Sequence, residues 1–320
     1  MVRSLFDPLF DESANEAVRN GLPDVVIPVI ELLTHLGDGA TVAAIAVVLY
    51  WFSSERRRTR IYVVAVGLGA LGISTGLKGV FALPRPDPAL LTFAPEAYGG
   101  YTFPSAHALG SAAIFSMLAI TLDVGKAWQR YFVAGLIIGV VMLSRVVHGV
   151  HYPGDVMVGA AVGLAFVAFM FWSYPQIDPE WAFGLAFVLG LAGLVLGARE
   201  HSILVVGASL GAGVAWHALK EIDARPKGAA ILVLGALVLP LLFVLRSVEL
   251  VGLLEGVFQY NLATLAVGYA IVTAAVIAVP FAAERLNDWR VVGWLQQALP
   301  FRGRAVDPSL IGTERNEVGE

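Results

Sequence analysis

The chain has 320 residues, of which 58% are hydrophobic and only 14% are charged. This composition is too apolar for a soluble protein, and it predicts a membrane protein with several spans. The net charge of −4, without a continuous basic face, sets nucleic-acid binding aside. Cysteine is absent, which excludes disulfides, thiolate metal sites and a cysteine nucleophile.

Residues 1–21 form a polar N-terminal segment with several acidic side chains, such as Asp11 and Glu16, and no apolar run. We expect no cleavable signal peptide there, so the membrane spans themselves must direct insertion. The next stretch, 24–36, is apolar but short and contains Glu31. It fits an interfacial or re-entrant helix as well as a further span, and the sequence leaves both open.

Nine longer apolar runs follow, and each approaches the roughly 20 residues that a helix needs to cross a bilayer. They lack the alternation of apolar and polar residues that marks a β-barrel, so we expect an all-α, polytopic membrane helical bundle. Beyond residue 283 the chain turns polar, and Trp289 and Trp294 indicate an amphipathic interfacial helix. The nine runs are 37–53, 61–82, 107–123, 131–147, 155–173, 181–198, 202–219, 228–247 and 259–281.

The distribution of basic residues predicts the orientation of the spans. Residues 56–60 include four arginines, and cytoplasmic loops are enriched in Lys and Arg, so this loop should lie inside. Threading nine spans outward from it places the polar tail, 284–320, on the same cytoplasmic side. We therefore expect a multi-pass protein, of the cell membrane, whose loops 85–105 and 145–155 lie on the non-cytoplasmic face.

Three polar clusters interrupt the apolar sequence, and all three fall on this non-cytoplasmic face. The first begins with Lys78 inside a predicted span, where a charge is costly and indicates either a functional site or a side chain that reaches the headgroups. Arg85 lies between Pro84 and Pro86 on a constrained loop. Its guanidinium is suited to bidentate contact with a phosphate, although a loop arginine near anionic lipid is the alternative.

The second cluster is Pro104-Ser105-Ala106-His107, where the next span begins. Ser105 can cap that helix, and the exposed amides of a helix N-terminus attract anions such as phosphate. His107 in the first turn would lie beside a bound anion. Taken alone, the cluster fits an ordinary cap followed by an interfacial histidine at least as well.

The third cluster runs from Ser144 and Arg145 to His151 and Asp155. His151 and Asp155 are four residues apart, so they share a face if the first turn of the span is helical. Asp155 can then accept the N–H of one imidazole nitrogen and leave the other nitrogen basic and directed at a phosphorus. This arrangement predicts a nucleophilic histidine.

A metal site is the alternative interpretation of these clusters, because His and Asp are common metal ligands. Lys78, Arg85 and Arg145 argue against it, since three cationic side chains would repel a metal ion and favour a phosphate. We therefore expect neither a metal nor another cofactor.

Together the clusters resemble the signature of the type 2 phosphatidic acid phosphatase superfamily, whose three blocks are written K-x6-RP, PSGH and SR-x5-H-x3-D. Every fixed spacing is kept, and one residue departs from the pattern, because Ala106 replaces the usual Gly. Ala would be strained there if the position needs a positive φ. The matching residues are Lys78 to Arg85-Pro86, Pro104 to His107, and Ser144-Arg145 through His151 to Asp155.

The resemblance implies a role for each of these residues. His151 would attack phosphorus and form a phosphohistidine, Asp155 would orient it, and His107 would protonate the leaving alkoxide. Water would then hydrolyse the intermediate without a metal ion. The residues that would hold the phosphate oxygens are Lys78, Arg85, Ser105, Ala106 and Arg145.

The expected function is metal-independent hydrolysis of a phosphate monoester or diphosphate on a membrane lipid. A lipid phosphotransferase, which passes the phosphoryl group to a lipid alcohol, is the main alternative, and a non-catalytic transporter or scaffold is a weaker one. Vanadium haloperoxidases share the site, but the many spans argue for a lipid substrate.

The same resemblance places a six-helix phosphatase core in residues 22–174. Residues 175–283 would form additional C-terminal transmembrane helices, whose expected role is structural. Formation of a homo-oligomer through these helices, or binding of a partner, is left open by the sequence.

Overall fold

The computed structural model describes residues 9–91, 100–174, 176–197, 199–250 and 262–298. These residues form helices and no β-strand, as the apolar runs without alternation predict. Six of the helices are long and apolar enough to cross a membrane. They are α5 (Arg57–Phe81), α7 (Ala127–Val147), α8 (Pro153–Ser173), α9 (Pro179–Leu196), α10 (Arg199–Leu219) and α13 (Leu262–Glu284).

The other three apolar runs also form helices, α4 (Gly39–Trp51), α6 (Ala106–Thr121) and α11 (Gly228–Leu250). Of these, α6 and the segment Gly228–Leu241 of α11 are apolar helices shorter than a span. The stretch 24–36 forms a 3₁₀ turn, η2 (Asp24–Val26), then α3 (Ile27–Leu33) and most of η3 (Thr34–Gly37). Together with α4 it is long and apolar enough to cross a membrane, but the two parts meet at a bend of 55°. The stretch is therefore one arm of a bent helix pair and not a straight tenth span.

Six helices, α3 to α8, fall within residues 22–174, where the sequence predicts the phosphatase core, but α3 and α4 form one bent pair and not two separate spans. Before them lies α2 (Glu12–Asn20), and after α5 comes the short turn η4 (Pro88–Leu90). In the polar tail α14 (Arg290–Ala298) forms where the tryptophans indicate a helix, with Val292 buried and Trp294 exposed. The division of the chain into domains stays a prediction.

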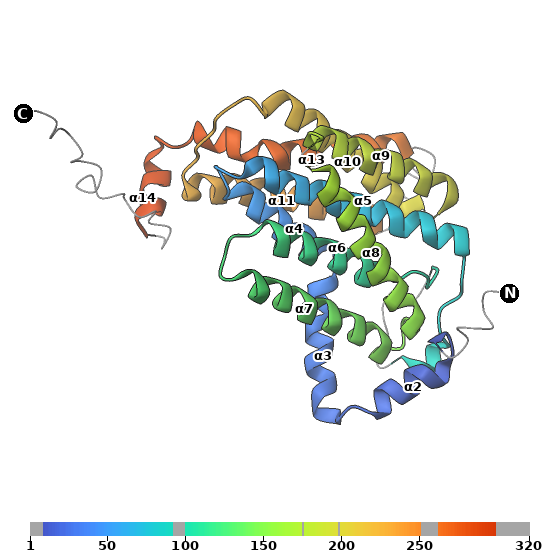
Figure 1. Cartoon of the computed structure of the whole chain (residues 1–320). Coiled ribbons are helices and arrows are strands. Elements are labelled where there is room, and N and C mark those ends of the chain that lie inside the picture. Colours follow the sequence, from blue (N-terminus) through green and yellow to red (C-terminus); the bar gives the residue numbers. More distant parts are fainter. Residues whose placement is uncertain (1–8, 92–99, 175, 198, 251–261, 299–320) are drawn as a thin grey trace, which may run out of the picture.

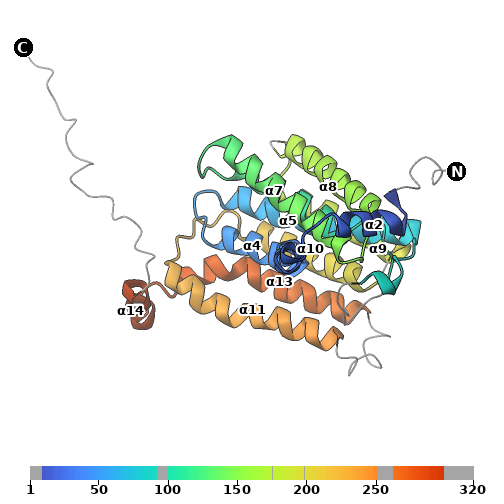
Figure 2. The ribbon, with the colours of Figure 1, turned by 90° about the horizontal axis from the view of Figure 1, so that it is seen from below.

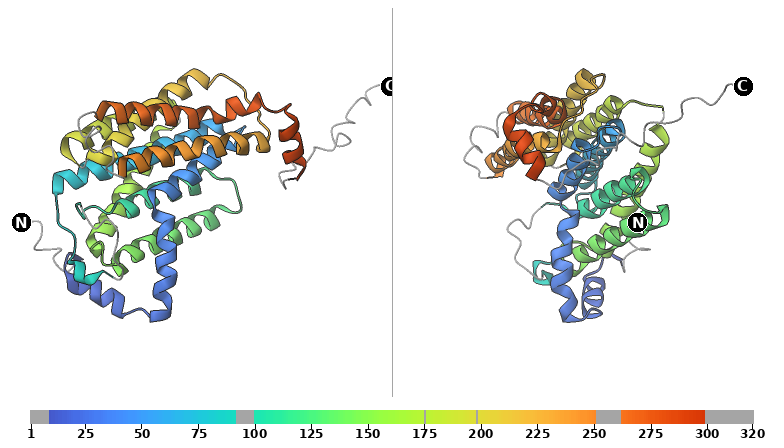
Figure 3. Two further views of the ribbon diagram at one scale, coloured as in Figure 1. Left: turned by 180° about the vertical axis from the view of Figure 1, so that it is seen from behind. Right: turned by 90° about the vertical axis from the view of Figure 1, so that its left-hand side faces the viewer.

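Most of the long helices run side by side, whereas α8 is inclined to them and α3 crosses their direction (Figure 1). The helix α5 lies between two groups, since it packs against α4, α6 and α8 of the core and, most extensively, against α9. Helices α9, α10, α13 and α11 continue the bundle in that order of contact (Figures 2 and 3). The C-terminal helices therefore extend the core along α5.

Glycines permit this close packing of helices. A Cβ at Gly163 of α8 would come within 2.5 Å of the Leu109 carbonyl oxygen of α6, and a Cβ at Gly190 of α9 within 3.1 Å of the Val206 amide nitrogen of α10. The Gly- and Ala-rich stretches in the C-terminal half thus serve the close helix packing that the sequence indicates.

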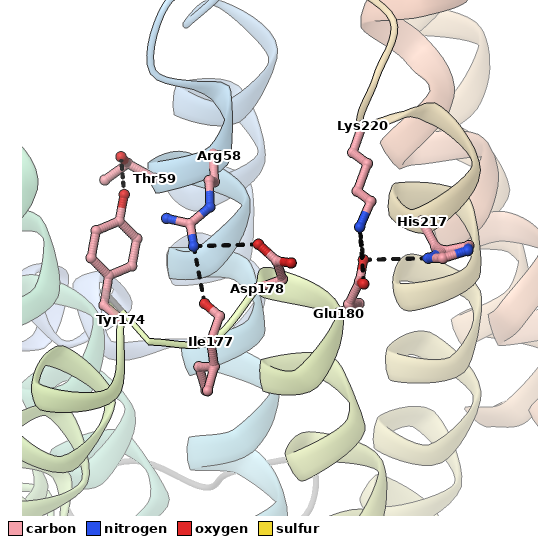
Figure 4. A network of polar contacts seen from close by, with 8 residues as sticks. All are labelled: Arg58, Thr59, Tyr174, Ile177, Asp178, Glu180, His217 and Lys220. Atoms are coloured by element: carbon pink, nitrogen blue, oxygen red, sulfur yellow. Dashed lines mark hydrogen bonds and ion pairs between the residues drawn. The ribbon is translucent and has the colours of Figure 1, made fainter.

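Polar contacts tie the helices together at the end that carries the arginine loop. Arg57 donates to the carbonyl oxygen of Ala224 (2.7 Å), and Arg60 donates to that of Thr121 (3.0 Å). Figure 4 shows the neighbouring contacts of Arg58 with Asp178 and of Lys220 with Glu180. Part of the arginine cluster therefore joins helix ends, in addition to any role in orientation.

We predict that Gly163→Val separates α6 from α8 and destabilises the fold by about 1–3 kcal/mol, because the new side chain meets backbone atoms that cannot move aside. Gly139→Val is the matched control, since a Cβ at Gly139 of α7 has no neighbour within 4 Å. Thermal unfolding of the two purified variants in detergent measures the difference. Equal unfolding temperatures would contradict this account of the packing.

Candidate active site

The three polar clusters lie at the ends of four helices. Lys78 is in the last turn of α5, and Arg145 is in the last turn of α7. His107 is in the first turn of α6, and Asp155 is in the first turn of α8. Because α5 begins at Arg57, its last turn is at the opposite end of the bundle from the arginine loop (Figure 1). The predicted gathering of the clusters on one face is therefore present in the fold.

His151 and Asp155 meet as the spacing predicts, although His151 precedes the helix. The Nδ1 of His151 lies 3.3 Å from Oδ2 of Asp155, and both side chains are almost fully buried. The same carboxylate oxygen accepts the backbone N–H of Tyr152 (2.9 Å). Pro153 starts α8 without the loss of a helical hydrogen bond, because first-turn amides have no intrahelical acceptor.

Thr102 joins this pair, and the sequence did not single it out. Its hydroxyl lies 3.0 Å from Nδ1 of His151 and also forms a short hydrogen bond with Oδ2 of Asp155. An ionised carboxylate only accepts, so the hydroxyl donates to Asp155 and its oxygen accepts the Nδ1–H of His151. This assignment leaves Nε2 of His151 without a proton, which is the tautomer that a nucleophile needs.

Three positive charges act on the His151 ring. Burial first, and then the charges of Arg85, Lys78 and Arg145, lower the pKa of His151 well below its usual range. Burial first, and then the Arg145 charge, also lower the pKa of His148 to about 4. Both imidazoles are therefore neutral near pH 7, and three cationic side chains lie within electrostatic reach of His151.

Two of these cations are held by the surrounding backbone and side chains. Arg85 donates to the carbonyl oxygen of Val150 (2.9 Å), next to His151. Arg145 donates to the hydroxyl of Thr34 (3.0 Å), while its buried Nε has no hydrogen-bond partner among the described residues. A buried, unsatisfied guanidinium N–H is costly, and an anion at this place would satisfy it.

Ser105 caps α6, as predicted, and it is fully buried. Its side chain accepts the N–H of Ala108 (3.5 Å), and its own N–H donates to the carbonyl oxygen of Asp155 (3.1 Å). Ala106 is the first helical residue, and among the described non-glycine residues only Ala82 has a positive φ. The replacement of Gly by Ala at position 106 is therefore free of the backbone strain considered above.

The second histidine of the site, His107, has a carboxylate partner from outside the three clusters. Its Nε2 lies 3.0 Å from Oδ1 of Asp38, at the bend between η3 and α4. No local pattern predicts this pair, because Asp38 is a single acidic residue between apolar runs and is distant from His107 along the chain.

The N-terminal segment also reaches the site. Asn15 of α2 is buried and donates its amide to the carbonyl oxygens of Val146 (3.1 Å) and His151 (2.9 Å). The ring of Phe10 lies 6.0 Å from that of Phe103 and 6.5 Å from that of Tyr152. Phe10 and α2 thus help to hold the His151 loop, a contact that the pattern of charges did not predict.

The described residues contain no group of three or more His, Asp or Glu side chains arranged to hold a metal ion. The fold and the site define a polytopic helical membrane protein with a buried histidine–aspartate pair and three cations at one end of its bundle.

Residues 58–179 match the model of the PAP2 superfamily. The decaprenylphosphoryl-5-phosphoribose phosphatase of Mycobacterium tuberculosis is 33% identical over 137 residues, which are 41% of this chain and 71% of the relative. The chain belongs to the PAP2 superfamily, and it is a lipid phosphatase.

Two further relatives are more distant. The phosphatidylglycerophosphatase B of Bacillus subtilis is 27% identical over 167 residues, 48% of this chain and 79% of the relative. The lipid A 1-phosphatase of Rhizobium etli is 28% identical over 180 residues, 48% of this chain and 73% of the relative. The resemblance drawn from the three blocks is thereby confirmed at the level of the family.

We predict that Thr102→Val lowers kcat/KM about 10- to 100-fold, because it removes a hydrogen bond to a charged group worth roughly 1.5–3 kcal/mol. Thr102→Ser keeps the hydroxyl and should retain most of the activity. Phosphate release from a lipid phosphate measures both variants. Equal activity of the Val variant and the wild type would show that Thr102 does not orient His151.

Proposed function

We propose that this enzyme hydrolyses a phosphate monoester or diphosphate of a membrane lipid through a phosphohistidine at His151, without a metal ion. One observation carries the proposal: the His151 imidazole is held at Nδ1 by Thr102 and Asp155, and the charges of three cationic side chains act on it. An oriented, neutral imidazole can attack phosphorus, and fixed positive charge stabilises the transferring phosphoryl group.

In the first step Nε2 of His151 forms a bond to phosphorus, and the bond between phosphorus and the ester oxygen breaks. His107 gives its proton to the leaving oxygen, so the lipid departs as an alcohol, or as a monophosphate from a diphosphate. In the second step His107 takes a proton from water, the resulting hydroxide attacks phosphorus, and the P–N bond breaks. His151 is restored and inorganic phosphate is released.

The cationic groups and the N-terminus of α6 bind the non-bridging oxygens of the phosphate in this proposal. Lys78, Arg85 and Arg145 supply charge, and the unpaired Nε–H of Arg145 is a donor ready for an anion. Ser105 and the backbone N–H of Ala106 add the donors of a helix N-terminus.

A lipid phosphate is the substrate class that the relatives support, since their names specify a decaprenyl phosphoribose, a phosphatidylglycerophosphate and lipid A. These three lipids each contain a phosphate and an apolar anchor and differ in the rest of the molecule. We propose that the enzyme recognises the shared part, which the site can reach at the ends of membrane-spanning helices.

We place the enzyme in the cell membrane with its site on the non-cytoplasmic face. The positive-inside rule supports this orientation, because the arginine-rich end of the bundle lies opposite the site. We further propose that residues 22–174 are the catalytic core and that 175–283 support it, since α9 packs along the helix that carries Lys78.

The test is phosphate release by the purified enzyme from phosphatidic acid, phosphatidylglycerophosphate and a polyprenyl phosphate and diphosphate. We expect free phosphate from at least one of these lipids, in equal amounts with and without EDTA, and inhibition by vanadate. His151→Ala should abolish the release. The matched control is His217→Ala, which changes an exposed histidine at the other end of the bundle (Figure 4).

Three results would contradict parts of the proposal. Loss of activity in EDTA that a divalent ion restores would exclude the metal-free mechanism. A new phosphorylated lipid without free phosphate would identify a phosphotransferase. Undiminished hydrolysis by His151→Ala would remove His151 as the nucleophile.

A further inference from the structure

A second carboxylate–histidine unit lies beside the His151 pair. Asp38 lies at the bend between η3 and α4, and both of its carboxylate oxygens contact an imidazole. Its Oδ1 is 3.0 Å from Nε2 of His107, and its Oδ2 is 2.7 Å from Nδ1 of His35. Asp38 thus links the exposed His35 (67%) to the less exposed His107 (26%).

The chemistry of the carboxylate determines which imidazole nitrogen carries which proton. An ionised carboxylate only accepts hydrogen bonds, so His107 donates from Nε2 and His35 donates from Nδ1. When His107 is protonated, its Nδ1–H is therefore the proton free for transfer. Once that proton has left, Nε2 keeps its proton and its hydrogen bond to Asp38, and Nδ1 becomes the basic nitrogen.

The other charged groups around His107 make this carboxylate necessary. Arg145 and Lys78 are the cations that act on the His107 ring, and Asp38 is the anion that acts on it. His148 interacts electrostatically with Arg145, His35 and His107. A protonated His107 beside two fixed cations needs a compensating negative charge, and Asp38 provides it.

We propose that Asp38 is the positioning residue of the acid–base histidine His107, and that His35 in turn fixes the Asp38 carboxylate. The inference rests on the proposed function. In phosphoenzyme formation, Asp38 stabilises the protonated His107 that donates Nδ1–H to the leaving oxygen. In hydrolysis of the phosphoenzyme, Asp38 holds Nε2–H while Nδ1 takes the proton from water, and no proton passes through Asp38 or His35.

This assignment gives the bent helix pair a function. A straight helix through residues 27–51 would follow one axis, whereas the 55° bend places Asp38 between the two arms. Gly37, just before it, is closely packed, since a Cβ there would come within 2.5 Å of a Val141 methyl and 3.5 Å of the His107 Cβ. The bend thus brings an acidic residue against the start of α6.

The experiment compares two substrates that differ in how much the leaving group needs a proton. One is the alkyl lipid phosphate hydrolysed best in the panel above, and the other is p-nitrophenyl phosphate, whose leaving group departs readily as an anion. In Asp38→Asn we expect kcat/KM for the lipid to fall about 10- to 100-fold, and for p-nitrophenyl phosphate about twofold at most. The alkaline limb of the lipid pH profile should move to lower pH, since the protonated His107 loses its counter-charge.

Matched variants separate this role from a general loss of structure. Asp38→Glu restores the negative charge and should recover part of the lipid activity. His35→Ala should lower kcat/KM for the lipid and spare kcat/KM for p-nitrophenyl phosphate. The controls are Asp178→Asn and His217→Ala, which change an exposed aspartate and an exposed histidine with ionic partners at the opposite end of the bundle. Both controls should keep the wild-type pH profile.

Equal losses for the two substrates, or an unmoved alkaline limb in Asp38→Asn, would overturn the positioning role. Should Asp38→Asn not fold, the same substrate comparison in His35→Ala decides, because His35 is mostly exposed. If His151→Ala and His107→Ala abolish lipid hydrolysis while Asp38→Asn behaves as wild type, only this inference fails. If His151→Ala stays active, the proposed function itself fails.

Discussion

The site depends on the hydrogen bonds that converge on Asp155. Its carboxylate accepts from Thr102 and from the N–H of Tyr152 and lies 3.3 Å from His151, and its backbone carbonyl accepts the N–H of Ser105. One buried residue at the start of α8 thus connects the His151 loop to the start of α6. The hydrogen bonds on Oδ2 offset part of the cost of burying this carboxylate, whereas its buried Oδ1 has no hydrogen-bond partner among the described residues.

The features that the sequence predicts are those that a local pattern of residues determines by itself. Apolar runs of helix length became helices because the backbone in a bilayer must satisfy its own hydrogen bonds. Ser105 became a cap and Pro153 a first-turn residue for similarly local reasons. The spacing of His151 and Asp155 predicted their contact, although His151 lies before the helix and not in it.

The remaining site residues depend on how distant segments pack, which no local pattern encodes. Asn15 and Asp38 belong to no motif in the sequence, and their hydrogen-bond partners lie far away along the chain. Thr102 is three residues before Ser105, but an isolated threonine in a loop indicates nothing by itself. The bend at Asp38 also escaped prediction, because an apolar stretch of that length fits several membrane arrangements. These residues share one function, which is to hold groups supplied by the predicted clusters.

The central claim is that His151 becomes covalently phosphorylated during turnover. The most direct measurement is rapid acid-free quenching of the wild-type enzyme with a lipid labelled in its phosphate, followed by mass spectrometry of the peptides. The account predicts an acid-labile, base-stable phosphate on the peptide that contains His151, and none in His151→Ala. An enzyme that turns over the lipid without any phosphorylated peptide, or with the phosphate on His107, would contradict the phosphorylation of His151.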